Sequence, residues 1–126
     1  MRAVDTNVLI RIVTGDNQPQ MDAAETFISN GAWISHLVLA EACWVLRTTF
    51  GLAAAQIASS VAMLLNHERF TIQDADVVER ALDSFRKRPK LGFSDCLIVE
   101  IARKNGHLPV GTFDRDLARL EGLQRL

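Results

Sequence analysis

Apolar residues recur along the chain in two patterns, as short runs and as longer stretches with a spacing of three or four residues. The short runs predict brief β-strands, and the longer stretches predict amphipathic helices. The predicted strands cover 2–4, 32–34, 70–72, 108–110 and 123–126. The predicted helices cover 5–15, 21–30, 36–50, 52–66, 74–87, 94–105 and 114–120.

Residues with known helix-end preferences mark several of these boundaries. Asp5, Ser35 and Ser94 are favourable N-cap types, and each stands directly before or at the start of a predicted helix. Gly15 and Gly31 suit the left-handed position that follows a helix. The alternation of strands and helices predicts an α/β fold with a parallel sheet covered on both faces.

Ligands of such sheets bind beyond the carboxyl ends of the strands. Asp5 directly follows the first predicted strand, and Thr112 and Asp114 follow the fourth. We therefore expect these residues at the functional site. Because no linker-like composition interrupts the chain, residues 1–126 are predicted to form a single domain.

Composition excludes several classes of protein. The 126 residues carry 14 Lys and Arg against 15 Asp and Glu, so a protein that holds nucleic acid by bulk positive charge is excluded. The same count does not exclude a nuclease that has a local acidic cluster. Two cysteines without a CxxC pair predict neither a disulfide framework nor a zinc site. The sequence has no signal-peptide core and no membrane span, so a cytoplasmic protein with reduced thiols is expected.

Glu41 is the only charged residue between Ala32 and Leu46. Helical spacing places it with Leu37 and Trp44, which predicts a carboxylate near the core side of its helix. A buried carboxylate is costly unless a cation or a proton compensates it. The alternative is a partly exposed glutamate at a helix rim.

Other acids also have structural interpretations when they are taken singly. Asp5 can act as an N-cap, and Asp95, Asp114 and Asp116 can favour the N-terminal end of a helix dipole. Gathered at one sheet edge, however, carboxylates repel one another unless a hard divalent cation binds them. Such a pocket indicates Mg²⁺ or Mn²⁺ and phosphodiester hydrolysis.

Four segments in order resemble the motifs of PIN domains, specifically the VapC group of toxin ribonucleases. They are residues 4–9, 39–41, 93–98 and 112–117. The resemblance extends over essentially the whole chain. It implies a three-layer α/β/α fold with about five short parallel strands in the order 3-2-1-4-5.

The same resemblance implies the site residues. The implied catalytic residues are Asp5, Glu41, Asp95 and Asp114, of which Asp5, Asp95 and Asp114 bind Mg²⁺ or Mn²⁺. Asn7 and Thr112 would support them through hydrogen bonds, while Asp116 would reach a second metal or favour a helix start. The implied reaction is endonucleolytic cleavage of RNA, with Glu41 orienting a metal ligand or accepting a proton from water.

Basic residues suggest how RNA would be held. Arg86, Lys87, Arg88 and Lys90 precede Asp95, and Arg115 follows Asp114. They would bind RNA phosphates, although the run at 86–90 is also typical of a solvated helix end. Trp33 and Trp44 are expected in the core or an interface rather than as base-stacking platforms.

The resemblance also implies two protein partners, a second copy of the chain and a cognate VapB-like antitoxin that offers an arginine to the acids. An alternative function is therefore a catalytically weak RNA- or antitoxin-binding module, whose acids capture a basic partner rather than catalyse. A receiver-like phosphoacceptor domain is a third alternative. It needs a lysine after a late strand, where this chain has Phe113 and Asp114.

Overall fold

The computed structural model describes residues 1–126 and confirms the predicted alternation of short strands with helices. Contacts divide the chain into two compact units, Met1–Ala75 and Asp76–Leu126, and each is described by itself. Six α-helices and parallel strands make this the mixed α/β class that the sequence predicts. None of these helices combines the length and the apolar character that crossing a membrane requires.

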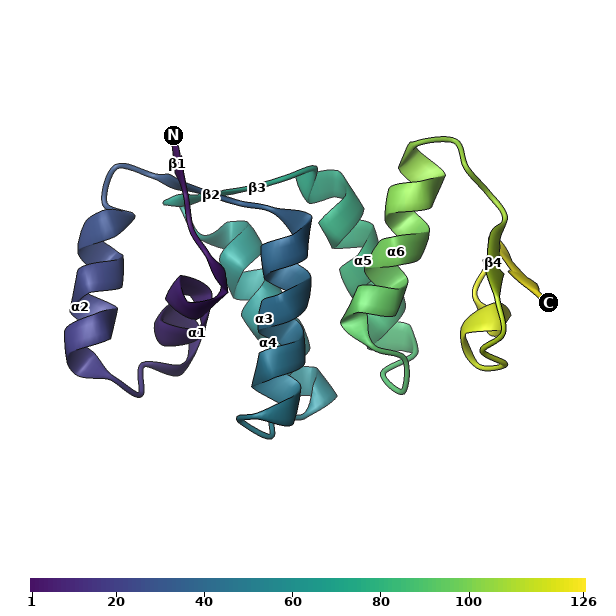
Figure 1. Cartoon of the computed structure of the whole chain (residues 1–126), viewed down its shortest axis with the longest axis horizontal. Helices are drawn as coiled ribbons and strands as arrows, with labels where there is room; N and C mark the ends of the chain where they lie inside the picture. The colour runs from purple at the N-terminus through teal and green to yellow at the C-terminus, as the bar shows by residue number, and fades with distance from the viewer. The chain divides into compact units, whose positions relative to one another are not determined.

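Three strands and four helices belong to the first unit. They are β1 (Arg2–Ala3), α1 (Thr6–Thr14), α2 (Gln18–Phe27), β2 (Ala32–Ile34), α3 (His36–Thr48), α4 (Ala54–Asn66) and β3 (Phe70–Ile72). In Figure 1 the strands of this unit run along the top of the view, and its helices lie below them. The second unit holds nearly all of α5 (Ala75–Lys87), then α6 (Phe93–Lys104), β4 (Val110–Thr112), a 3₁₀-helix η1 (Leu117–Arg119) and β5 (Leu123–Arg125).

The strands form two parallel sheets. In the first, β2 lies between β1 and β3, and Trp33 pairs with Ala3 on one side and Thr71 on the other. In the second, β4 pairs with β5, with Thr112 opposite Arg125. The predicted orders 3-2-1 and 4-5 are therefore present as two separate sheets, one in each unit, so the predicted order 3-2-1-4-5 is matched only in part.

Helix α2 begins at Gln18, three residues before the predicted start. The side chain of Asn17 accepts a hydrogen bond from the backbone N–H of Gln20 at 3.0 Å, and Pro19 fits the first helical turn. An N-cap and a proline together therefore extend the helix into the predicted loop.

Two further boundaries correct the predictions in the second unit. The N-cap of α6 is Gly92, not Ser94, because the helix already includes Phe93. Strand β4 begins at Val110, where the prediction has it end. Pro109 lacks a backbone N–H, so pairing starts with Val110, whose N–H donates to the carbonyl of Gly122 at 2.9 Å.

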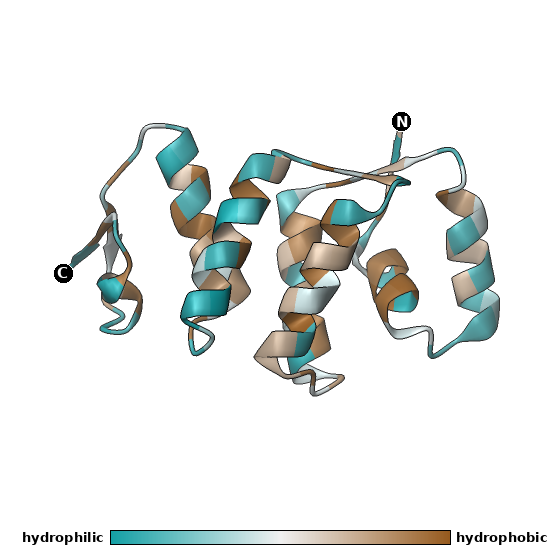
Figure 2. Ribbon diagram, turned by 180° about the vertical axis from the view of Figure 1, so that it is seen from behind, coloured by the Kyte–Doolittle hydropathy of each residue, from teal (hydrophilic) through white to brown (hydrophobic).

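Each unit buries its own apolar residues. In the first unit the largest fully buried side chains are Leu9, Ile10, Ile34, Leu39, Leu46 and Val61. In the second, Phe85 of α5 packs edge-on against Phe93 of α6, with ring centroids 5.9 Å apart. Figure 2 shows the corresponding pattern on the ribbon, since hydrophobic and hydrophilic residues occupy different sides of α5. This amphipathic helix is the clearest one in the sequence, and its predicted range differs by one residue.

Candidate metal centre

Asp5 lies at the junction between β1 and α1. It is the N-cap of α1, and its Oδ1 accepts a hydrogen bond from the backbone N–H of Val8 at 3.2 Å. The side chain is exposed, and the bond to Val8 leaves Oδ2 for another ligand. The N-cap interpretation and the metal-ligand interpretation of Asp5 are therefore compatible, because they use different oxygens.

Glu41 lies on α3 and is joined to the start of α1. The hydroxyl of Thr6 donates a hydrogen bond to Glu41 Oε2 at 2.6 Å, across 35 positions of sequence. Since Thr6 follows Asp5 directly, this bond brings two predicted acids of the first unit to the same helix start. Sequence reasoning missed Thr6, although its position between Asp5 and Asn7 was the available signal.

The predicted burial of Glu41 is wrong. Its side chain is exposed, as are Leu37 (73%) and Trp44 (65%) on the same face of α3. The core face of this helix is formed instead by Leu39, Ala42, Cys43 and Leu46. The helix has apolar residues on nearly every side, so its sequence periodicity does not show which side faces the core. The partly exposed glutamate was the correct alternative.

Asp95 lies in the first turn of α6, where it is half-buried. Its backbone N–H donates to the carbonyl of the N-cap Gly92 at 3.1 Å. The neighbouring Cys96 is buried, and burial together with the negative charge of Asp95 raises the pKa of its thiol to about 11. The Asp95 carboxylate at the helix start therefore has as its neighbour a thiol that stays protonated and uncharged at neutral pH.

Asp114 follows β4 in a turn that its own side chain stabilises. Its Oδ1 accepts hydrogen bonds from the backbone N–H groups of Asp116 at 2.8 Å and Leu117 at 3.1 Å. Its own N–H donates to Thr112 Oγ1 at 3.0 Å. Thr112 thus contacts the backbone of the segment that presents Asp114. As with Asp5, one carboxylate oxygen binds local backbone and Oδ2 is left for another ligand.

Asn7 and Asp116 are placed less informatively. Asn7 is exposed and lines a hollow between α1 and α2, but its side chain forms no hydrogen bond with Asp5 or Glu41. Asp116 is also exposed, and its side chain does not cap the 3₁₀-helix that replaces the predicted helix over 114–120. The structure therefore adds nothing to the roles that the sequence suggests for Asn7 and Asp116.

The donor set is one of oxygen atoms, which suits Mg²⁺ or Mn²⁺ rather than a softer metal. Asp5 and Glu41 belong to the first unit, and Asp95 and Asp114 belong to the second. Neither unit by itself gathers three Asp, Glu, His or Cys side chains that could hold a metal ion. The chemistry of the residues fits a hard divalent cation.

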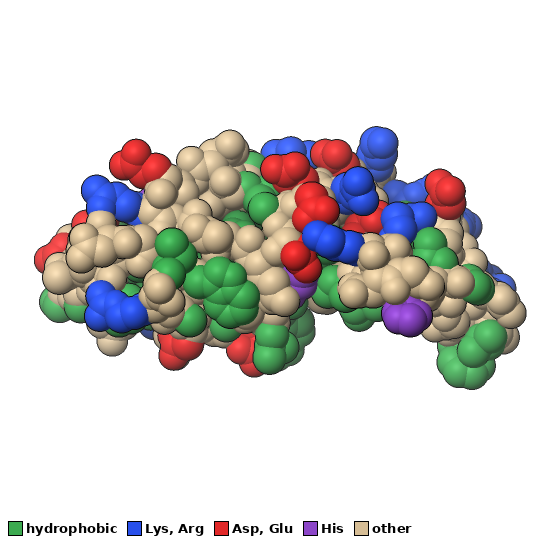
Figure 3. Space-filling model, turned by 90° about the horizontal axis from the view of Figure 1, so that it is seen from above, with side chains coloured by type: hydrophobic (Ala, Val, Ile, Leu, Met, Phe, Trp, Pro, Cys, Tyr) green, Lys and Arg blue, Asp and Glu red, His purple; other side chains and the backbone are tan.

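Basic residues lie near Asp95 and Asp114 in the sequence, and their side chains are exposed in the structure. Arg86 and Lys87 end α5, and Arg88 and Lys90 follow them in the loop before α6. Arg115 is exposed directly after Asp114. Figure 3 shows acidic and basic side chains interleaved on one face of the molecule, without a single continuous basic patch. This mixture agrees with the formal charge of −1.

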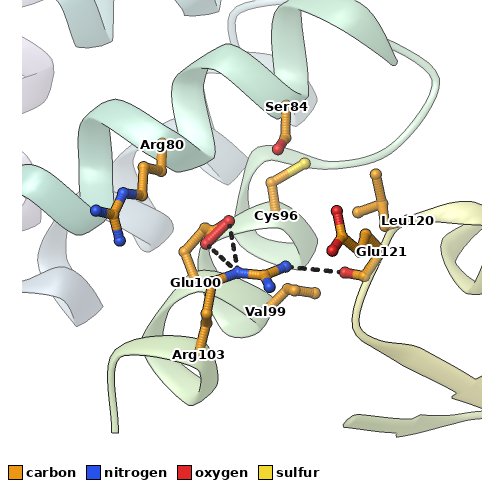
Figure 4. Close-up of a pocket in the computed structure, with 8 residues that line it drawn as sticks. All are labelled: Arg80, Ser84, Cys96, Val99, Glu100, Arg103, Leu120 and Glu121. Carbon is orange, nitrogen blue, oxygen red and sulfur yellow. Dashed lines mark hydrogen bonds and ion pairs between the residues drawn. The ribbon is translucent and has the colours of Figure 1, made fainter. Parts of the chain in front are cut away.

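Arg103 forms an ion pair within α6 that the sequence did not predict, and it also contacts the segment before β5. Arg103 Nε donates to both carboxylate oxygens of the buried Glu100, at 3.3 and 3.1 Å, while its Nη2 donates to the carbonyl of Glu121 at 2.9 Å (Figure 4). These residues line a pocket with Arg80 and Cys96. The guanidinium thereby fixes the C-terminal segment to the helix that carries Asp95.

Comparison with known families gives one result. The model of a family described as PIN domain matches residues 2–123, a range that includes every predicted site residue. No significant match to a curated protein or to a solved structure is found.

Proposed function

The chain belongs to the PIN domain family, whose members are generally Mg²⁺-dependent nucleases, and from this premise we propose that it is a metal-dependent endoribonuclease. We propose further that it is the toxin of a VapBC-type toxin–antitoxin pair and that residues 1–126 act as one domain. The observation that carries the proposal is the hydrogen bond from Thr6 to Glu41, which holds one predicted acid at the helix start that another, Asp5, caps.

In this proposal Asp5, Asp95 and Asp114 hold Mg²⁺ or Mn²⁺. Their oxygen ligands are of the type that these ions prefer. Asp5 and Asp114 each use Oδ1 for backbone N–H groups and can offer Oδ2. The bound ion would stabilise the negative charge that develops on the phosphate.

Glu41 then acts as the general base. The attacking water loses its proton to Glu41 as its oxygen bonds to phosphorus, and the opposite P–O bond breaks with the electron pair leaving on the departing oxygen. Because Thr6 donates to Oε2, it fixes the carboxylate and leaves Oε1 available to take the proton. Thr112 and Asn7 are proposed to support the site, and Asp116 is proposed to contact a second metal or only to favour the turn.

The exposed basic residues would bind RNA phosphates on either side of the cleaved bond. Arg86, Lys87, Arg88 and Lys90 are all in solvent, as is Arg115. Contacts of this kind position a nucleic acid without reading its sequence. We therefore expect affinity for RNA to fall with increasing salt concentration.

The partners follow from the same proposal. A VapB-like antitoxin would inhibit the enzyme by offering an arginine to the exposed carboxylates, and a second copy of the chain would form a homodimer in the cytoplasm. A second candidate function, a catalytically weak RNA- or antitoxin-binding module, is favoured by the same exposure of Asp5, Glu41 and Asp114.

Cleavage of RNA by the purified protein separates these functions. We expect Mg²⁺ or Mn²⁺ to support endonucleolytic cleavage, and EDTA to abolish it. Asp95→Asn should reduce the rate at least 100-fold, since it removes a charged metal ligand, and Mg²⁺ should raise the Tm of the wild type but not of this variant. Ser94→Ala, at the next position, is the matched control. Equal cleavage with EDTA would contradict the proposal, and RNA binding without cleavage would favour the binding module.

A further inference from the structure

Each unit has one exposed aromatic ring close in sequence to a candidate acid. The chain has two tryptophans and six phenylalanines, and only Trp44 and Phe113 are largely exposed, at 65% and 82%. Trp44 lies one helical turn after Glu41, and Phe113 directly precedes Asp114. The exposed aromatic rings of each unit thus occur beside an acid of the proposed site.

In the first unit, Trp44 belongs to the exposed face of α3. Glu41 precedes it by three residues and Arg47 follows it by three, so both charged side chains are its neighbours on the helix surface. All three side chains are exposed. The ring therefore lies between a carboxylate and a guanidinium.

In the second unit, Phe113 lies in the turn after β4. The hydrogen bond between the Asp114 N–H and Thr112 Oγ1 spans this residue and fixes the backbone on both sides of it. Arg115 is exposed two residues later. An aromatic ring, a carboxylate and a guanidinium again occur together.

A ribonucleotide offers a matching set of groups. Its base presents a π-face that stacks on an aromatic ring, and its phosphates pair with arginine or with a metal held by carboxylates. Aromatic and arginine side chains also occur in protein–protein interfaces, but Asp and Glu are depleted there. The carboxylate beside each ring, which a bound metal ion would neutralise, therefore favours RNA over a second copy of the chain as the occupant.

We propose that Trp44 and Phe113 are base-stacking residues that hold unpaired bases of the RNA substrate, with Arg47 and Arg115 contacting adjacent phosphates. This inference rests on the proposed ribonuclease function. It assigns to Trp44 the role that the sequence alone did not favour.

The test is the binding of a fluorescein-labelled unpaired RNA 12-mer, measured by anisotropy with Ca²⁺ in place of Mg²⁺. Trp44→Ala and Phe113→Ala should each raise the Kd about 10-fold, the size expected for the loss of one stacked base. Trp44→Phe should keep the Kd within about threefold of the wild type, whereas Trp44→Leu, which has bulk but no π-face, should bind as weakly as Trp44→Ala. Leu37→Ala, also exposed on α3, is the control and should bind normally.

Several outcomes would overturn the inference. It fails if the alanine variants bind like the wild type, if a duplex of the same sequence binds equally well, or if Trp44→Leu restores binding. It also fails if the variants change only the oligomeric state seen by light scattering. Should Trp44→Ala not fold, the comparison of Trp44→Phe with Trp44→Leu decides the question. Weakened binding without any Mg²⁺-dependent cleavage would instead contradict the proposed function and leave the stacking role intact.

Discussion

Thr6 and Glu41 are joined by a 2.6 Å hydrogen bond in which the threonine hydroxyl donates to Oε2 of the carboxylate. The donor lies in the first turn of α1 and the acceptor lies in the middle of α3. Because Asp5 caps the same helix start, this bond sets the position of one proposed catalytic acid relative to another.

Removing this hydrogen bond should impair catalysis more than folding. Thr6→Val keeps the shape of the side chain but cannot donate, so the Glu41 carboxylate loses its orientation. We expect kcat to fall about 10-fold while the free energy of unfolding changes by less than about 1 kcal/mol, since the bond is partly exposed. Thr6→Ser retains the hydroxyl and should keep most of the activity. Equal rates for the valine and serine variants would contradict this role.

Two substitutions of Asp5 should separate its two roles. Asp5→Asn keeps an oxygen that can accept from the Val8 N–H, so the helix cap should survive while the charged metal ligand is lost. We expect normal urea unfolding and at least a 100-fold loss of Mg²⁺-dependent cleavage. Asp5→Ala should lose activity equally and also about 1 kcal/mol of stability. An active Asp5→Asn variant would contradict its assignment as a metal ligand.

The ion pair on α6 should matter for stability. Arg103→Ala leaves the buried Glu100 carboxylate without its partner and frees the carbonyl of Glu121, at a cost of about 1–3 kcal/mol in the free energy of unfolding. The free energy of unfolding of Arg103→Lys should fall between those of the wild type and Arg103→Ala, because an ammonium cannot reproduce the planar fork of the guanidinium. Urea unfolding measures both values. Unchanged stability of Arg103→Ala would show that this pair contributes nothing.

Stability should decrease at alkaline pH because of the buried thiols. Burial raises the pKa of Cys43 from 9.0 to about 12, and burial and the charge of Asp95 raise that of Cys96 to about 11. The unfolded chain therefore releases these protons first, so this stabilisation is intact below pH 9 and is lost as the pH rises towards 11–12. At pH 10 we expect a loss of about 1 kcal/mol for each thiol.

Urea unfolding at pH 8, 9 and 10 measures this effect. The chain has no tyrosine, which simplifies the assignment of titration in this range. The Cys43→Ala/Cys96→Ala double variant should show a shallower decline in the free energy of unfolding. An identical decline in the wild type and in this variant would exclude the thiols as its cause.

Local signals predicted the helix and strand elements well, because each depends on a few neighbouring residues. Asp5, Ser35 and Gly15 mark helix ends in the structure as they do in the sequence. The start of α2 differs from the prediction because the side chain of Asn17 caps the helix and Pro19 is tolerated in its first turn. The start of β4 was misplaced because the prediction began the strand before Pro109 rather than after it.

Features that depend on distant residues were harder to predict. The exposed position of Glu41 follows from which face of α3 packs inward, and a helix with apolar residues on nearly every side does not reveal this. The contacts of Glu41 with Thr6 and of Arg103 with Glu121 join segments 35 and 18 residues apart. No periodicity in the sequence encodes such pairs. The candidate acids themselves come from the resemblance in the motifs, and their joint role as a metal site stays a prediction.

Asp5 and Asp114 share a property that affects how an ion would bind. Each carboxylate has one oxygen fixed by backbone N–H groups of the following turn, so its rotamer is set when the chain folds. The rotational entropy of these two ligands is therefore lost during folding and not during metal binding. A metal that arrives at the proposed site would meet preorganised ligands, and its affinity would reflect coordination and desolvation more than the ordering of these side chains.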